Sequence, residues 1–370
     1  TYIVLSLVMI VFSFTYYPKY KQSGGEATIS WDVSGYYWYL PSLFIYKDLK
    51  NLNFSDSIRA KYGCSPDNQQ ITFLPDGKKV LKYSSGMALQ YAPFFLIAHV
   101  LAKPLGYKAD GLSTPYQLSI HLGALFMMMF GLWFLRKVLL EYFKDSTVVW
   151  VLICLVIGTN YLDYVAIDLG MSHSWLFAWY CFLLYQSNLF YKKPSYISAL
   201  LIGIILGVLA LTRPTEIIAC ILPLLWGVNV LSVESIVARF KFIKANVGLY
   251  ITSAFAMIAI GSIQLIYWKY VTGHFLVYSY GDQEFTWKHP HFLNYIFSYR
   301  CGWLIYCPLM AMPYLGFLFL FKKKDIVWSI AFFSFCYLWI VCAWDIWWYG
   351  GRAMIQGYAA LMFPFAALIE

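Results

Sequence analysis

The chain has 370 residues, of which 61% are hydrophobic and only 12% are charged. Soluble domains carry charge on about a quarter of their residues, so this composition excludes an ordinary soluble protein and predicts an all-α, polytopic membrane protein. The formal net charge is +9, but no basic run alternates with loop aromatics in a soluble domain. This pattern excludes nucleic-acid binding and points to topology signals and to anionic headgroups or phosphates.

A membrane helix needs about 20 largely apolar residues, and many segments of the chain approach that length. We expect membrane spans at residues 1–17, 113–135, 147–163, 173–190, 196–212, 215–231, 247–268, 303–321, 326–343 and 353–369. With a further apolar stretch at residues 87–104, the predicted bundle has about 10 or 11 spans.

The short basic loops predict the orientation of these spans. Residues 136–144, 191–193, 239–244 and 322–324 are rich in Lys and Arg and fall at alternating helix ends. Such loops face the cytoplasm, so the opposite loops face outward. The outward loops contain most of the unusual polar residues, which places the predicted functional site outside the cytoplasm.

The stretch 87–104 leaves one alternative open. If it spans the membrane, the loop from residue 18 to residue 86 is cytoplasmic; if it is re-entrant or interfacial, that loop is outside. The loop carries basic residues from Lys19 to Lys82, which favours the cytoplasm. However, the positive-inside rule weakens for loops beyond about 60 residues.

A lone carboxylate, Asp32, precedes the aromatic run YYWYLPSLFIY at residues 36–46. A charge at a membrane edge is costly unless it has a partner or a task. Asp32 either caps the helix that follows it or acts as a general base for an acceptor hydroxyl or amine. In the second case Tyr36 and Tyr37 provide an aromatic surface for a sugar or a lipid chain.

Two arginines interrupt apolar sequence near predicted outer helix ends. Arg213 is followed by Glu216 in LTRPTE, and Arg352 follows a double glycine in WWYGGRAM. Arg213 forms either a local ion pair with Glu216 or a guanidinium contact with a lipid phosphate. The same choice holds for Arg352, whose neighbour Trp348 is either an interfacial anchor or part of the binding rim, and the glycines would let backbone amides approach an anion.

Other outer loops supply further candidates for substrate contacts. His173 begins a predicted helix on the outer side, after Asp163 and Asp168. It is either a polar residue at the N-terminus of that helix in the interface or, with Asp168, a contact to the substrate. Lys288 and Arg300 in the loop 269–302 are candidates for phosphate binding. A His-Pro-His sequence with nearby carboxylates lies in the same loop and could bind a metal, but it lacks the spacing of a helical zinc motif. A divalent metal therefore stays open as the less favoured alternative.

Nucleotide and nucleophile signatures are missing from the sequence. It contains no GxxxxGK[ST], GxGxxG or GxSxG motif. A cytosolic nucleotide is therefore not expected as the direct substrate. An outward base together with several arginines fits an anionic substrate that is already in the membrane, such as a lipid phosphate.

The order of several segments resembles a known family. These segments are GMALQYAPFFLIAHVLA, GTNYLDYVAIDLGMSHSW, GVLALTRPTE, FSYRCGWLIYCPL and WWYGGRAMIQGYAALMFPFA. In this order they resemble bacterial type C (GT-C) membrane glycosyltransferases, similar to protein O-mannosyltransferases and the aminoarabinose transferases of lipid A, which are glycosyltransferase family 39-like. The resemblance implies a polytopic enzyme of the bacterial inner membrane that takes a sugar from a polyprenyl-phosphate carrier and transfers it on the periplasmic side with inversion.

The family places its catalytic carboxylate in the first outer loop, and Asp32 matches that position. Juxtamembrane helices follow it in the family, which matches residues 33–46 and 87–104. Many relatives carry an acidic pair at the base, whereas Val33 follows Asp32 here. The sequence therefore leaves open whether Asp32 acts alone or with Glu26 or Asp48.

We expect a single domain over residues 1–370, with a first outer loop at 18–112 and a second at 269–302, and a chain truncated at one or both ends. In the expected reaction, Asp32 deprotonates the acceptor, and Arg213 and Arg352, with Arg300 or Lys288, stabilise the departing lipid phosphate. Its partners would be a polyprenyl-phosphate sugar, membrane lipids and an acceptor protein, lipid or glycan. No cofactor is predicted.

Two other functions stay open at this stage. A transporter or flippase of a lipid-linked saccharide would need important polar residues near the bilayer midplane. A non-catalytic subunit of an envelope assembly would use Asp32 and Arg213 only structurally.

Overall fold

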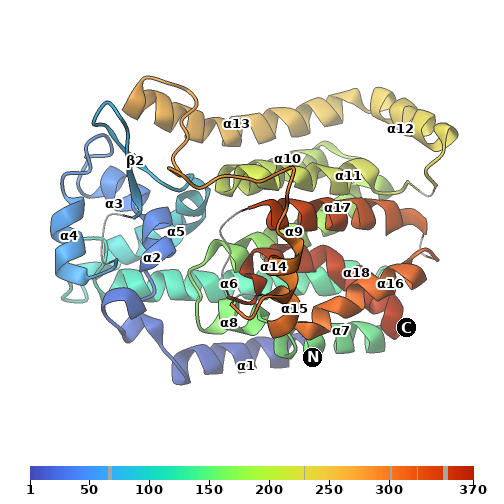
Figure 1. Cartoon of the computed structure of the whole chain (residues 1–370), viewed down its shortest axis with the longest axis horizontal. Coiled ribbons are helices and arrows are strands. Elements are labelled where there is room, and N and C mark those ends of the chain that lie inside the picture. The colour runs from blue at the N-terminus through green and yellow to red at the C-terminus, as the bar shows by residue number, and fades with distance from the viewer. Residues whose placement is uncertain (66–68, 229, 301, 323, 345–348) are drawn as a thin grey trace.

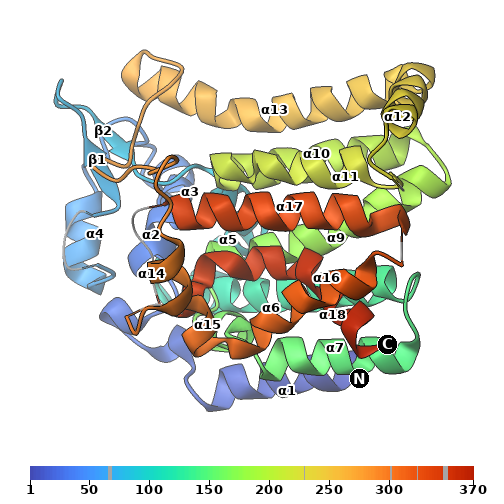
Figure 2. The ribbon, with the colours of Figure 1, turned by 45° about the vertical axis from the view of Figure 1, so that its right-hand side comes forward.

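The computed structural model describes residues 1–65, 69–228, 230–300, 302–322, 324–344 and 349–370. About 71% of it is helical, and the long helices run side by side in one bundle with the two termini close together (Figures 1 and 2). The predicted all-α bundle is confirmed. Among the described residues the strands form one small antiparallel hairpin, β1 (Ile71–Phe73) and β2 (Lys79–Leu81), with Ile71 opposite Leu81.

The predicted spans correspond to helices of the bundle. They are α1 (Tyr2–Thr15), α6 (Thr114–Leu139), α7 (Asp145–Ile157), α9 (Ser172–Lys192), α10 (Tyr196–Thr212), η3 (Pro214–Cys220) with α11 (Ile221–Leu225), α13 (Val247–Thr272), η4 (Pro308–Ala311) with α16 (Met312–Leu320), α17 (Lys324–Ala343) and α18 (Tyr358–Ile369). Within the described part of the chain, five helices are long and apolar enough to cross a membrane, at residues 2–21, 114–139, 247–272, 325–343 and 350–369. Four of the other predicted spans form shorter apolar helices, at residues 145–157, 196–212, 214–225 and 308–320, and the span predicted at 173–190 is α9, which has 21 residues but is not among the five. The chain is therefore a helical membrane protein.

The remaining elements connect these helices or pack against them. They are η1 (Lys19–Lys21), η2 (Gly24–Glu26), α2 (Trp31–Tyr37), α3 (Tyr39–Phe44), α4 (Ser55–Tyr62), α5 (Gly86–Ala102), α8 (Tyr161–Ala166), α12 (Val233–Ala245), α14 (Phe292–Phe297), α15 (Trp303–Tyr306) and η5 (Tyr349–Gly357). The hairpin, α2, α3 and α4 lie at the left end in Figures 1 and 2, and α12 lies at the right end. We call these the hairpin end and the α12 end.

Helix α5, the uncertain stretch of the sequence, does not connect the two ends. Its first residue, Gly86, lies against Thr212, the last residue of α10. Near its other end, His99 Nδ1 lies 2.6 Å from the hydroxyl of Tyr116 in the first turn of α6. Helix α10 ends, and α6 begins, in the half of the bundle that faces the hairpin end. Residues 18–86, which include Asp32, therefore lie on the same side as the loop between α7 and α9.

Small residues allow α10 and α13 to pack closely. A Cβ on Gly203 would lie 2.2 Å from the backbone oxygen of Ser253, and a Cβ on Gly207 would lie 2.8 Å from Ile260. This Gly-xxx-Gly spacing lets two membrane helices approach until their backbones touch. Close packing here fixes α13, which is otherwise little buried.

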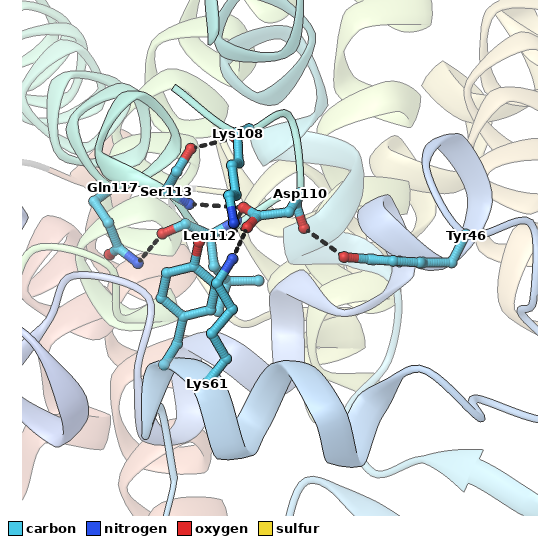
Figure 3. Close-up of polar contacts among 8 residues, drawn as sticks. Tyr46, Lys61, Lys108, Asp110, Leu112, Ser113 and Gln117 are labelled. Atoms are coloured by element: carbon cyan, nitrogen blue, oxygen red, sulfur yellow. Dashed lines mark hydrogen bonds and ion pairs between the residues drawn. The ribbon is translucent and has the colours of Figure 1, made fainter. Parts of the chain in front are cut away.

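A carboxylate cluster ties α4 to the start of α6 at the hairpin end (Figure 3). Asp110 accepts hydrogen bonds from Lys61 and from Tyr62, the latter at 2.5 Å, and from the backbone N–H groups of Leu112 and Ser113 at 3.2 Å. Burial alone would raise the pKa of Asp110, but these hydrogen bonds outweigh it and lower the pKa below its usual value. The cluster braces the segment that carries α2.

Candidate functional site

Asp32 lies in the first turn of α2, next to a strained residue. Trp31 has a φ of 44°, a left-handed conformation that is rare for a bulky side chain and costs on the order of 1–3 kcal/mol. Its backbone N–H donates to the carbonyl of Cys64 at 2.9 Å, which helps to hold this conformation. The carboxylate of Asp32 does not cap its own helix, because its hydrogen bonds go to Tyr83 and Arg352.

Arg352 reaches Asp32 from the opposite end of the sequence. Its Nη2 donates to Oδ2 of Asp32 at 2.7 Å, and the two side chains are 20% and 25% exposed. The double glycine makes this approach possible, since Gly350 and Gly351 both adopt left-handed φ values, 63° and 62°. A Cβ on Gly351 would also lie 2.6 Å from Trp303. Any side chain there would displace the turn that delivers Arg352.

Tyr83 holds the other carboxylate oxygen. Its hydroxyl donates to Oδ1 of Asp32 at 2.8 Å, and its ring lies 4.5 Å from the ring of Tyr36 and 5.9 Å from that of Tyr280. Burial and the charge of Asp32 raise the pKa of Tyr83 well above its ordinary value, so the hydroxyl stays protonated and continues to donate. Sequence reasoning missed Tyr83, and no motif around it marks its role.

Arg213 joins the same neighbourhood without a fixed partner. The residue directly follows α10 and is partly exposed, and its guanidinium makes no hydrogen bond or ion pair with the described residues. Tyr36 and Tyr280 both interact electrostatically with Arg213 and also with Asp32. The structure therefore brings Asp32, Arg213 and Arg352 together around aromatic side chains, with one guanidinium available.

A buried polar network lies behind these arginines. Glu216 is 1% exposed, and its carboxylate accepts hydrogen bonds from Tyr180 at 2.5 Å, Gln356 at 3.0 Å and Tyr337 at 3.3 Å. Gln356 also lies 3.0 Å from Nδ1 of His173. The alternative of a local Arg213–Glu216 ion pair is not what the structure contains, although the two charges interact at longer range. Glu216 and His173 support the site from behind and do not face an open space.

Sequence reasoning missed the other members of this network. Gln356 follows Arg352 by four residues in the same segment, and this spacing was the available signal. Tyr180 and Tyr337 lie within ordinary apolar helices and carried no signal.

Asp168 lies at the edge of the cluster. Its carboxylate forms an ion pair with Lys19 at 2.7 Å, joining the first loop to the loop before α9. Asp163 lies nearby in α8, and burial together with the charge of Asp168 raises the pKa of Asp163 to about 6. Arg352 also interacts electrostatically with Asp168. The edge therefore carries negative charge close to Arg352.

Several predicted site residues lie elsewhere. Tyr37 is fully buried and its hydroxyl donates to the carbonyl of Gly111 at 2.5 Å, so its side chain packs the interior. Lys288 and Arg300 are exposed, and in the described part of the chain neither contacts Asp32 or the two central arginines. Trp348 lies outside the described residues.

Within the ranges that the structure describes, no group of three or more His, Cys, Asp or Glu residues could hold a metal ion. Searches of protein-family models, of curated proteins and of solved structures found no match to this chain. A partly exposed carboxylate can take a proton, and two guanidinium groups that both act electrostatically on Tyr36 and His173 can attract an anion.

Proposed function

We propose that the protein is a GT-C-like, polyprenyl-phosphate-sugar-dependent glycosyltransferase that acts on the extracytoplasmic side of the bacterial inner membrane. The observation that carries the proposal is the ion pair of Asp32 with Arg352, residues separated by 320 positions. The charge of Arg213 acts on Tyr36 together with the charges of this pair. A carboxylate and two arginines meet at a helix end of a membrane protein. This combination suits an acceptor hydroxyl and a lipid phosphate in one site.

In the proposed reaction, an acceptor hydroxyl oxygen attacks the anomeric carbon of the sugar while the bond from that carbon to the phosphate oxygen breaks. Asp32 takes the proton of the hydroxyl, and the polyprenyl phosphate leaves as an anion. Arg213 and Arg352 bind that anion and stabilise the charge that develops on it. One carboxylate suffices, because a phosphate leaving group needs no protonation by a second acid.

The partnered state of Asp32 is compatible with a role as base. A carboxylate has about four lone-pair sites, and Tyr83 and Arg352 occupy two of them. Arg352 offers five N–H donors, so it can keep Asp32 and still contact a phosphate. Other carboxylates of the same loop are less suited: Asp48 accepts backbone N–H groups of its own turn at 2.8 and 3.1 Å.

The test is a transfer assay in proteoliposomes with synthetic polyprenyl-phosphate sugars. Asp32→Asn should lower kcat by about 10²–10⁴-fold, the usual contribution of a general base, because Asn cannot take the proton. Asp48→Asn is the matched control from the same loop, and it should retain nearly full turnover. A normal turnover number for the Asp32 variant would refute the assignment.

A second measurement separates the enzyme from a transporter of a lipid-linked saccharide. The enzyme releases free polyprenyl phosphate in step with glycosylated acceptor, whereas a transporter changes only the leaflet that holds the intact donor. Movement of intact donor without release of polyprenyl phosphate would support the transporter instead. The proposed side of the site is tested by labelling Ser57→Cys in α4 with an impermeant thiol reagent from the periplasmic face, against Ala245→Cys at the end of α12; protection of the α4 position would contradict it.

A further inference from the structure

A cavity of about 240 Å³ lies between α9, α10, α11 and α13. None of its lining residues belongs to α2, which carries Asp32. Its lining includes the last turn of α9 and the first turns of α10 and α13, which places it toward the α12 end. The wall is mostly apolar. Its main hydroxyls already have partners, since Tyr191 donates to the carbonyl of Pro223 at 2.7 Å and lies 3.0 Å from the hydroxyl of Tyr250. Such a wall suits a hydrocarbon chain better than a polar ligand.

The cavity opens at the surface of the bundle. Leu224 in its wall is 43% exposed, and Ala254 on α13 is exposed as well. Close packing of Gly203 against Ser253 holds α13 beside α10, so the cavity is a fixed feature of the helix arrangement. In a membrane protein this opening faces lipid.

Helix α12 lies at the same end of the bundle as the cavity. Its residues Val233, Ile236, Val237 and Phe240 form an exposed apolar stripe with helical spacing, as in helices that lie in the membrane interface. The ring of Phe242 lies 5.4 Å from the ring of Tyr191, which lines the cavity.

Lys241 and Lys244 lie in the same turn of α12 as Phe242, on other faces of that helix. Both are exposed, and neither forms an ion pair within the described ranges. Arg239, by contrast, is already used, because it donates to the carbonyl of Trp226 and stacks over Tyr191 at 4.3 Å. The two lysines are therefore cations that are available to a ligand at this end.

We propose that this cavity binds one acyl chain of an anionic glycerophospholipid, whose phosphate contacts Lys241 and Lys244. The lipid lies in the leaflet at the α12 end, away from the Asp32 site, and the inference does not depend on the proposed transfer reaction. Juxtamembrane lysines attract anionic headgroups, and a neutral lipid would gain nothing from them. The apolar wall holds the chain and the lysines select the headgroup.

The test is photo-crosslinking with phosphatidylglycerol that carries a diazirine in its acyl chain, in vesicles of phosphatidylcholine. Crosslinks are expected in the peptides that contain Leu224 and Ala254. Ala254→Trp should reduce crosslinking at least fivefold by filling the mouth, whereas Ala259→Trp, exposed on the same helix outside the cavity, should match the parent. Leu224→Trp serves as a second filling variant if the first does not fold.

The headgroup is tested by competition in the same assay. Unlabelled phosphatidylglycerol should displace the probe, and the Lys241→Gln, Lys244→Gln double variant should weaken this displacement by on the order of tenfold. Lys322→Gln, at a different helix end, is the charge control and should behave like the parent. Crosslinking unaffected by either Trp variant, equal displacement by phosphatidylcholine, or stronger displacement by a polyprenyl phosphate would each overturn the proposal.

Discussion

The contact between Asp32 and Arg352 can be measured with a double-mutant cycle of Asp32→Asn and Arg352→Gln. Two unit charges about 4 Å apart near a protein surface attract by about 4 kcal/mol before desolvation is subtracted. Exposed pairs retain about 0.2–1 kcal/mol, and breaking a buried pair costs about 3–5 kcal/mol. The two side chains are 25% and 20% exposed, between these limits. We therefore expect a coupling free energy of about 1–3 kcal/mol.

Asp32→Asn suits the cycle because an asparagine side chain can still form hydrogen bonds with both Arg352 and Tyr83. Its oxygen can accept from Arg352, and its amide can donate to the hydroxyl of Tyr83, so that mainly the charge is lost. The assay is equilibrium unfolding in mixed detergent micelles with a graded denaturing detergent. Each single variant should lose stability, and the double variant should lose little more than either one.

The control cycle pairs Asp48→Asn with Arg352→Gln. The Asp48 carboxylate accepts hydrogen bonds within its own turn, from the backbone N–H groups of Asn51 and Asn53, so this coupling should be zero within about 0.3–0.5 kcal/mol. A coupling for Asp32 and Arg352 that is no larger than this control would refute the arrangement of the site.

Three further predictions follow from single contacts. Tyr83→Phe removes the hydroxyl that donates a hydrogen bond to Asp32 at 2.8 Å. We expect the variant to lose about 1 kcal/mol of stability and to show a shifted pH–rate profile, with an unchanged KM for the lipid-linked sugar. An unchanged pH–rate profile would contradict the proposed role of Tyr83. Burial and the neighbouring Asp168 raise the pKa of Asp163 to about 6, so the folded state holds this proton more tightly than the unfolded state, and the free energy of unfolding falls as the pH rises from about 4 to 6. In unfolding experiments across this pH range, Asp163→Asn should remove roughly 2 kcal/mol of that decline. An identical pH dependence in the parent and the variant would contradict the prediction. Gly203→Ala places a Cβ 2.2 Å from the backbone of α13 and should destabilise the bundle by about 1–3 kcal/mol, whereas Gly261→Ala, with nothing within 4 Å, should be neutral or stabilising in thermal unfolding.

Apolar length made the bundle predictable from sequence. Segments such as 113–135 and 247–268 correspond to α6 (Thr114–Leu139) and α13 (Val247–Thr272), because a membrane helix must satisfy its own backbone hydrogen bonds over a fixed thickness. Boundaries differ where polar residues continue the helix, as at the end of α6, which includes Arg136 and Lys137. Residues 87–104 were ambiguous because composition alone does not distinguish a helix that crosses the membrane from one whose two ends lie on the same side of it.

Residue chemistry pointed to individual members of the site. Asp32, Arg213 and Arg352 stood out because a charge in apolar sequence needs a partner or a function. The same reasoning chose Tyr37, Lys288 and Arg300, which the structure leaves out of the cluster. An isolated charge or tyrosine does not reveal which way its side chain points.

The sequence by itself determined the helical class and the positions of the long apolar helices, and it singled out Asp32, Arg213 and Arg352 as unusual charges. Only the tertiary structure decided which of those charges meet. The Asp32–Arg352 pair joins positions 320 residues apart, and Glu216 bonds Tyr180, Tyr337 and Gln356 in preference to its neighbour Arg213. Local patterns record spacing along one helix, whereas these contacts depend on how α2, α9, α17 and the segment before α18 pack together, and that packing is a property of the whole chain.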